Sequence, residues 1–234
     1  MNQEQFIQAL KEKGIELSDL QLKQFELYYQ TLVEWNEKMN LTAITNKEDV
    51  YLKHFYDSLT ISFDYDLDSQ SLCDIGAGAG FPSIPLKIVY PHLHITIVDS
   101  LTKRITFLKH LCEVLGLENV NPISARAEEY AIEHRESFDI VTARAVARLN
   151  VLDELCLPLV KVEGDFITLK GLKAKEELKE AKSGIEKLGG KVMKEVDFTL
   201  TDENDYRSNI FIHKVKSTPQ KYPRQFGKIK KKPL

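Results

Sequence analysis

Cysteine and long apolar runs are scarce in this chain of 234 residues. The three cysteines, Cys73, Cys112 and Cys156, lie far apart in apolar surroundings, which indicates reduced, buried thiols and argues against a disulfide framework or a zinc site. The six histidines form no pattern of metal ligands, so we expect no bound metal. Residues 1–15 are too polar for a signal peptide, and no apolar run reaches the length of a membrane span. These absences predict a cytoplasmic protein that does not enter a membrane.

Acidic side chains are absent from residues 217–234, although the whole chain has a formal net charge of −3. That segment contributes +6, which leaves −9 for residues 1–216. A run of like charges interrupted by prolines cannot form a core, so we predict a flexible, basic C-terminal tail. The alternative is a solvated terminus that serves only solubility. The basic residues of the tail are Lys221, Arg224, Lys228, Lys230, Lys231 and Lys232.

Three of the 11 glycines, Gly76, Gly78 and Gly80, alternate between a short apolar run with strand character and a helical apolar pattern. Glycine is needed where the backbone adopts positive φ or lies against a ligand. A helix that begins there offers free N–H groups, and Pro82 suits a first helical position. A tight strand-to-helix turn without a ligand is the alternative interpretation.

The spacing of these glycines does not match the dinucleotide fingerprint G-x-G-x-x-G, because its last place would be Phe81 or Ser83. Asp74 stands two residues before the first glycine, a pattern similar to motif I of the Rossmann-like S-adenosylmethionine (SAM) methyltransferases. Asp99 ends the next β-branched run, 19 residues after Gly80. A carboxylate at that place can accept hydrogen bonds from two ribose hydroxyls. The two features together predict a nucleoside cofactor.

Helical periodicity occupies residues 1–65, with helices expected at 3–13, from Ser18 to Met39, and at 47–64. Ser18 and Gln21 form the pattern of a capping box, and Thr102 is expected to cap a later helix that Gly116 ends. From residue 66 to 216 strands alternate with helices, which predicts a mostly parallel sheet with helices on both faces. The seven strands are expected near 72–75, 95–99, 120–124, 138–142, 165–169, 191–200 and 207–215, the last two in an antiparallel arrangement.

This pattern divides the chain into an N-terminal helical extension (1–65), an α/β domain (66–216) and the basic tail (217–234). In open α/β sheets, ligands bind beyond the carboxyl ends of the strands. We expect that edge to collect one group after each successive strand and to form a shared site. The groups are residues 76–81, Asp99, Ala127 with Glu128, Arg144, and Lys170.

The chain resembles the RsmG (GidB) family of bacterial 16S rRNA guanine-N7 methyltransferases over nearly its whole length. The motifs that carry the resemblance lie at residues 29–42, 54–58, 74–82, 98–104, 126–128, 142–147, 169–171 and 222–224. The resemblance implies a class I SAM-dependent methyltransferase fold, SAM as cofactor, and methylation of guanine 527 of 16S rRNA, either free or within the small ribosomal subunit.

The resemblance also implies cofactor contacts at Gly76, Phe81, Ala127, Glu128 and Arg144. Asp99 joins them as the expected ribose acceptor, and Gly78 and Gly80 as parts of the glycine loop. The basic residues of the tail are expected to bind RNA phosphates, and we expect a monomer.

Guanine N7 has a free lone pair at neutral pH, so the enzyme's task is in-line alignment and no side chain is assigned a certain catalytic role. Arginine pairs well with the O6 and N7 edge of guanine, which makes Arg144, Arg148 and Lys170 candidates for contact with the base or a phosphate. For each of them a surface salt bridge is the alternative.

Two other classes of protein remain as alternatives. One is a nicotinamide-dependent oxidoreductase, which Asp99 suits but the glycine spacing does not. The other is a non-catalytic RNA-binding or ribosome-assembly factor that retains the fold.

Overall fold

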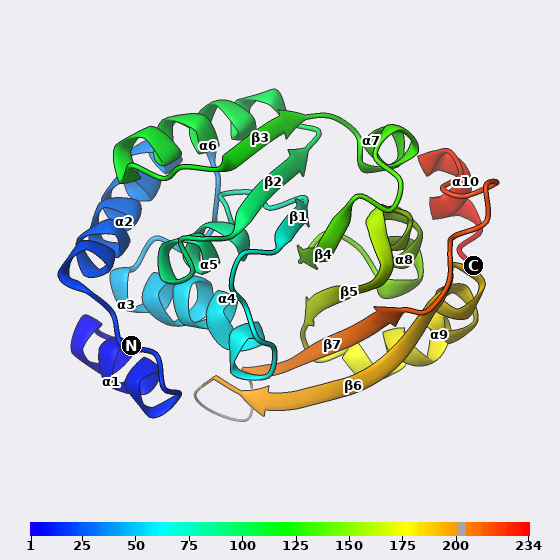
Figure 1. Ribbon diagram of the computed structural model, residues 1–234. Coiled ribbons are helices and arrows are strands. Elements are labelled where there is room, and N and C mark those ends of the chain that lie inside the picture. The colour runs from blue at the N-terminus through cyan, green and yellow to red at the C-terminus, as the bar shows by residue number, and fades with distance from the viewer. Residues whose placement is uncertain (201–204) are drawn as a thin grey trace.

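A seven-stranded sheet forms the centre of the computed structural model, which describes residues 1–200 and 205–234 (Figure 1). The strand order is β3-β2-β1-β4-β5-β7-β6. Strands β1 to β5 are parallel, and β7 pairs antiparallel with both β5 and β6, which confirms the predicted sheet and its antiparallel end. The strands are β1 (Ser71–Ile75), β2 (His94–Asp99), β3 (Val120–Ser124), β4 (Phe138–Arg144), β5 (Val160–Lys170), β6 (Gly190–Thr199) and β7 (Tyr206–Lys214).

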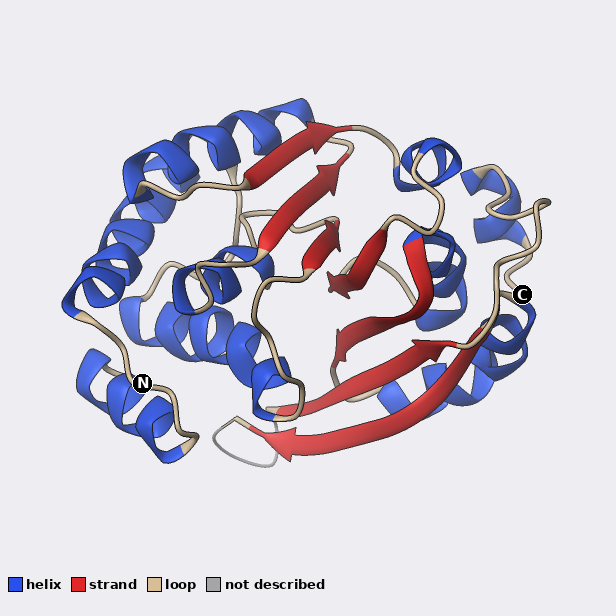
Figure 2. Ribbon diagram, in the orientation of Figure 1, coloured by secondary structure: helices blue, strands red, loops and turns tan. Residues whose placement is uncertain are grey.

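Helices cover both faces of this sheet (Figure 2). They are α1 (Gln3–Glu12), α2 (Asp19–Met39), α3 (Lys47–Val50), α4 (Asp57–Leu59), α5 (Ser83–Val89), α6 (Thr102–Leu115), α7 (Ala127–Glu133), α8 (Leu149–Cys156), α9 (Ala174–Lys187) and α10 (Phe226–Lys231). A π-helix (Tyr51–Tyr56) joins α3 to α4, and short 3-10 helices follow α4 (Thr60–Phe63) and α8 (Leu157–Leu159). In the described part of the chain no helix is both long and apolar enough to cross a bilayer.

Alternate residues of the strands enter two separate cores, because successive side chains of a strand point to opposite faces. Leu72 and Ile97 pack with the N-terminal helices, α5 and α6. Cys73 and Val98 pack with α7, α8, α9 and α10. The helices predicted for the N-terminal extension are therefore present and share a continuous core with one face of the sheet.

Polar side chains of α2 fix that helix to the α/β part of the chain. The amide of Gln21 donates to the carbonyl of Ile88 at 2.8 Å, and that of Gln24 donates to the carbonyl of Leu115 at 2.8 Å. Both carbonyls lie in the last turn of a helix, where they have no partner within their own helix. Gln21 also completes the predicted capping box with Ser18.

Some element boundaries differ from the predictions. The single helix expected over 47–64 changes its winding at the π-helix, and β5 begins at Val160, five residues earlier than expected. Thr102 does not cap α6; it is the first residue of that helix, and the Asp99 carboxylate accepts the backbone N–H of Leu101 at 2.9 Å instead. Pro82 directly precedes α5 and is not its first residue.

The prediction of a flexible tail is wrong. Residues 226–231 form α10, and Tyr222 and Ile229 are buried against the core beneath α8. The guanidinium of Arg224 is bound by the fully buried carboxylate of Glu154, with its Nη2 2.6 Å from Oε2. Two apolar anchors and one ion pair hold the segment, while its lysines remain exposed to water.

Candidate active site

The three glycines of the loop after β1 all adopt positive φ: 72° at Gly76, 60° at Gly78 and 101° at Gly80. A Cβ at Gly80 would lie 2.7 Å from the Tyr28 hydroxyl, and one at Gly76 would lie 2.7 Å from a methyl of Val146. A Cβ at Gly78 would have no described atom within 4 Å. Packing therefore excludes a side chain at Gly76 and Gly80, whereas Gly78 faces open space.

Asp74 organises this loop from inside. Its side chain is fully buried, and Oδ2 accepts the backbone N–H of Ser83 at 3.1 Å, which ties the end of β1 to the first residue of α5. Burial raises the pKa of Asp74 to about 7. The acidic residue of the motif thus supports the loop from beneath.

A cavity of about 780 Å³ opens at the carboxyl ends of β1, β2 and β3; it is called the first cavity below. It brings together four of the residues predicted to bind the cofactor: Gly76, Asp99, Ala127 and Glu128. Its remaining lining residues are Ile75, Val98, Ser100, Leu101, Arg104, Ser124, Ala125, Arg126, Glu129, Ala145, Val146, Leu155 and Phe226.

Asp99 is the last residue of β2 and is buried in the wall of this cavity. Oδ1 accepts the N–H of Leu101 at 2.9 Å, and Oδ2 lies 3.1 Å from the guanidinium of Arg104. A carboxylate oxygen has more than one lone pair, so both can accept a further hydrogen bond. The carboxylate is thus held in place and retains capacity for a ligand.

A second cavity, of about 390 Å³, adjoins the first, and Ala145 lines both. Ala145 follows β4 and has a φ of 57°. Lysine and arginine outnumber acidic residues by four to two in the lining of the second cavity; its other members are Lys53, His54, Asp57, Arg144, Ala147, Leu169, Lys170, Gly171, Glu177 and Arg207.

Asp57 holds two of these guanidinium groups. Its Oδ2 lies 2.8 Å from Nη1 of Arg144, the last residue of β4, and its Oδ1 lies 3.1 Å from Nε of Arg207 on β7. All three side chains are at least three-quarters buried. Asp57 belongs to the motif at residues 54–58, but no sequence signal pointed to Arg207, which lies 150 residues away and meets Asp57 only in the fold.

His54 completes the cluster around Arg144. Nη2 of Arg144 lies 3.2 Å from Nδ1 of His54, and Nε2 of His54 lies 2.9 Å from the hydroxyl of Thr42. Nδ1 also lies 3.2 Å from the carbonyl oxygen of Lys53, which already accepts a hydrogen bond from Nη1 of Arg144 at 3.1 Å. Because arginine can only donate, we assign Nδ1 as the acceptor from Arg144 and place the ring proton on Nε2. Burial and the charge of Arg144 lower the pKa of His54 to about 3, which keeps the ring neutral.

Phe81 lies beneath this cluster and lines neither cavity. Its ring stacks on His54 at 4.4 Å and on Tyr28 at 5.3 Å, and the guanidinium of Arg144 lies 5.0 Å above it. Gly78 and Gly80 also lie outside both linings. The structure therefore places Phe81 as a support for Arg144 and His54.

The other two basic side chains predicted to contact RNA, Lys170 and Arg148, each form salt bridges with glutamates. Lys170, the last residue of β5, reaches the second cavity with Nζ 2.9 Å from Glu177. Arg148 lies outside both linings and pairs with Glu176 and Glu180, each at 2.8 Å, on exposed helix surface. Arg148 thus forms a surface salt bridge, as the alternative interpretation predicted, whereas Lys170 lines the second cavity.

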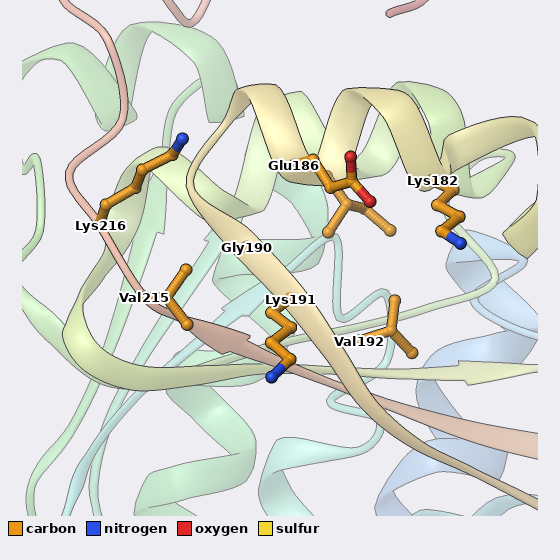
Figure 3. A pocket seen from close by; sticks show the side chains of 8 residues that line it. Lys182, Glu186, Gly190, Lys191, Val192, Val215 and Lys216 are labelled. Atoms are coloured by element: carbon orange, nitrogen blue, oxygen red, sulfur yellow. The ribbon is translucent and has the colours of Figure 1, made fainter.

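A further cavity of about 590 Å³ lies between α9 and the start of β6, at the edge of the sheet opposite the two cavities above (Figure 3). Three lysines line it, Lys182, Lys191 and Lys216, and Figure 3 shows that their ammonium groups do not converge. Within residues 1–200 and 205–234, no three His, Cys, Asp or Glu side chains gather as ligands for a metal ion.

Solved structures with a similar fold include a methyltransferase and a protein crystallised with AdoMet. M. jannaschii TYW2 in complex with AdoMet is 17% identical and aligns with a TM-score of 0.54, covering 69% of this chain and 76% of that one. The precorrin-6y C5,15-methyltransferase of Geobacter metallireducens is 20% identical with a TM-score of 0.51, covering 68% and 86%. At these identities the likeness shows the fold alone, and it confirms the predicted class I methyltransferase fold.

Sequence relatives match over the full length. A ribosomal RNA small subunit methyltransferase G of Oceanobacillus iheyensis is 60% identical, and one of Lysinibacillus sphaericus is 57% identical, each over 100% of both chains. The model of the GidB family, described as rRNA small subunit methyltransferase G, matches residues 21–206. The chain therefore belongs to the rRNA small subunit methyltransferase G family.

Proposed function

We propose that this protein transfers the methyl group of SAM to N7 of guanine 527 in 16S rRNA. The observation that carries the proposal is the pair of adjoining cavities that share Ala145. One contains a buried carboxylate at the end of β2, and the other is lined by basic side chains. A nucleoside cofactor and an RNA base can thus meet across a single residue.

The first cavity has the chemistry that SAM requires. Because Asp99 and Gly76 both line this cavity, we assign Asp99 to the ribose hydroxyls and the backbone at Gly76 to the methionine part. Ala127 and Glu128, at the start of α7, form another part of the wall. When bound, SAM supplies a methyl group already activated by its sulfonium.

The second cavity suits guanine and its phosphate. Lys53, Arg144, Lys170 and Arg207 surround it, and arginine donors match the O6 edge of guanine. Asp57 holds Arg144 and Arg207 in fixed orientations, so the donors are preorganised before RNA binds. We assign Arg144 and Lys170 to orientation of the base, which leaves N7 directed at the cofactor cavity.

The transfer needs no proton acceptor, because N7 of neutral guanine carries a lone pair and no proton. Alignment of the lone pair with the methyl–sulfur bond is then the main contribution of the protein. His54 stays neutral beside Arg144 and serves to position that guanidinium. The cytoplasm, which contains the ribosomal substrate, is the proposed location.

The test measures transfer of a tritiated methyl group from SAM to 30S particles and to naked 16S RNA, with the labelled nucleoside identified after digestion. We expect label in N7-methylguanosine and none in RNA with adenine at position 527. Arg144→Ala should slow transfer strongly. Arg148→Ala is the matched control, because that guanidinium is held on the surface by Glu176 and Glu180. Binding of SAM without any transfer to RNA would favour a non-catalytic assembly factor.

A further inference from the structure

The C-terminal segment contributes an aromatic side chain to the first cavity. Phe226, the first residue of α10, lines that cavity together with Leu155 of α8 and Val146. Its side chain is 36% exposed, whereas Ile229 on the same helix is fully buried. Since Ile229 anchors the helix, the partly exposed ring of Phe226 is free to contact a ligand in this cavity.

The position of Phe226 is fixed by its neighbours in the chain. The carboxylate of Glu154, fully buried on α8, accepts the backbone N–H of Arg224 at 2.8 Å as well as its guanidinium. Arg135 donates to the carbonyl of Thr218 at 2.6 Å and to that of Tyr222. The segment before α10 is therefore bound to α8 and to the loop after α7, so the ring of Phe226 has a defined place at the cavity.

The walls of the cavity differ in polarity. Asp99 belongs to the end of β2, where hydrogen bonds to a ribose are expected. Leu155, Val146 and Phe226 provide apolar surface, and α10, which carries Phe226, packs against α8, which carries Leu155. Asp99 and this apolar wall line the same cavity, so an adenosine whose ribose binds Asp99 can place its flat base against the wall.

We propose that the ring of Phe226 packs against the adenine of bound SAM, so that the C-terminal segment forms part of the cofactor site. This inference depends on the proposed use of SAM. It assigns a cofactor-binding role to a segment that the sequence analysis assigned only to RNA. The lysines of the same helix remain exposed to water.

Calorimetric titration of the full chain with SAM and with adenosine tests the contact. Stacking of a base on an aromatic side chain changes affinity by about tenfold or more on alanine substitution. Phe226→Ala should weaken SAM and adenosine by the same factor, about tenfold, and Phe226→Leu should recover only part of that difference. Ile132→Ala is the control, because Ile132 is an exposed apolar residue of α7 outside the cavity lining.

Fluorescence of a tryptophan introduced at position 226 tests the contact with adenine without relying on a change in affinity. Phe226→Trp should retain binding, and the fluorescence of the introduced indole should change on addition of adenosine. The signal of Trp35, the single native tryptophan, is subtracted from a wild-type titration. Methionine alone should leave the fluorescence of the introduced indole unchanged, because it lacks the base.

The outcomes separate this inference from the proposed function. Wild-type protein that binds neither SAM nor adenosine would contradict the proposed function itself. Tight SAM binding that Phe226→Ala leaves unchanged would overturn the inference alone. Unchanged SAM affinity together with weaker RNA binding would assign Phe226 to the RNA. A denaturation curve that matches the wild type establishes that each variant is folded.

Discussion

Asp57 illustrates how one buried carboxylate can organise a cationic site. Two guanidinium groups that line the same cavity repel each other, and neither could be buried without a counter-charge. Asp57 contacts both, through different oxygens, at 2.8 and 3.1 Å. Two guanidinium groups and one carboxylate leave this cluster with a net positive charge, which suits a ligand that carries phosphate.

Asp99 carries the most direct prediction for the cofactor site. Asp99→Ala should weaken SAM binding by about 1.5–3 kcal/mol, the scale of hydrogen bonds to a charged group. Calorimetric titration measures the difference, and Asp64→Ala, on the surface outside the first cavity, is the control. Because Asp99 also accepts the N–H of Leu101, Asp99→Asn is measured beside it. Equal affinity in wild type and Asp99→Ala would remove this carboxylate from the site.

Asp153 gives a prediction for stability against pH. Its side chain is fully buried between α8 and Gly184 of α9, and burial raises its pKa to about 8 from the usual 3.8. As pH rises from about 4 to 8, the carboxyl group of Asp153 loses its proton in the unfolded chain but keeps it in the folded chain. The free energy of unfolding therefore falls over this pH range. Asp153→Asn should therefore be more stable than the wild type at pH 8, by more than about 1 kcal/mol, with a smaller difference at pH 4.

Urea unfolding at both pH values measures the effect. Asp66→Asn, at an exposed carboxyl group, is the control that should show no such gain. A difference between Asp153→Asn and the wild type that is the same at pH 4 and pH 8 would mean that Asp153 is ionised in the folded protein.

Residues whose role follows from local spacing were predictable from the sequence. The glycines need positive φ because of the turn between β1 and α5, and Asp99 stands at the end of a β-branched run. The contacts of Asp57 with Arg207, and of Phe226 with the first cavity, depend on the packing of distant segments. Neither hydrophobic periodicity nor motif spacing predicts contacts between distant segments, so only the structure reveals them.

At the scale of the element, the π-helix Tyr51–Tyr56 explains how the N-terminal extension reaches the site. It carries Lys53 and His54, and Asp57 follows it directly. A π-helix widens the turn and shifts the side-chain directions of the residues that follow, and such elements frequently occur at functional sites. The sequence predicted a helix here, but apolar periodicity does not distinguish the two windings over six residues.

Helix α10 shows why a charged segment can still be ordered. Composition predicted flexibility for the tail, yet Tyr222 and Ile229 are buried and Arg224 meets a buried carboxylate. Arg224 is thus engaged in structure, whereas the exposed lysines of α10 keep their charge available. Deletion of residues 217–234 would leave Glu154 buried without its partner, so point substitutions are the better test of RNA binding.

Replacement of Lys228, Lys230, Lys231 and Lys232 by glutamine should weaken RNA binding and flatten its dependence on salt. The slope of log affinity against log salt should fall by about 0.7 for each phosphate of single-stranded RNA that the variant no longer neutralises. SAM affinity should not change. Filter binding over a salt series measures the slope, and Lys182→Gln, at the opposite edge of the sheet, is the control. An unchanged slope would place the RNA footprint on the rim of the second cavity.

At the scale of the whole molecule, the strand order brings the two cavities together. β1 lies between β2, which ends at Asp99, and β4, which ends at Arg144. The loop that follows β1 therefore lies between these two side chains. The N-terminal helices pack on one face of the sheet and bring Asp57 to β7, while α10 reaches the first cavity from the other face. Each cavity is therefore completed by a segment from outside the central strands.

Neither His54 nor Asp57, which both line the second cavity, is suited to remove a proton from a base at neutral pH. His54 has a pKa of about 3 and a guanidinium beside Nδ1, and a proton on Asp57 would weaken its ion pairs with Arg144 and Arg207. A general base contributes about 10²–10⁴-fold only where a proton must move. Methylation of guanine N7 involves no such proton, so the site and the proposed reaction agree.

Single-turnover methylation should accordingly stay nearly flat from pH 6 to pH 9 at saturating SAM and RNA, because His54 remains neutral throughout that range. His54→Gln and Asp57→Asn should lower RNA affinity or the transfer rate through the position of Arg144, without introducing a slope against pH. Rapid-quench measurements of the tritiated methyl group give the profile. Saturation is required because Asp74, with a pKa of about 7, supports the glycine loop and can make cofactor affinity vary with pH. A rate that rises tenfold per pH unit through neutrality, and no longer rises in one of these two variants, would contradict N7 as the target. It would indicate instead a nitrogen that must lose a proton before it accepts the methyl group.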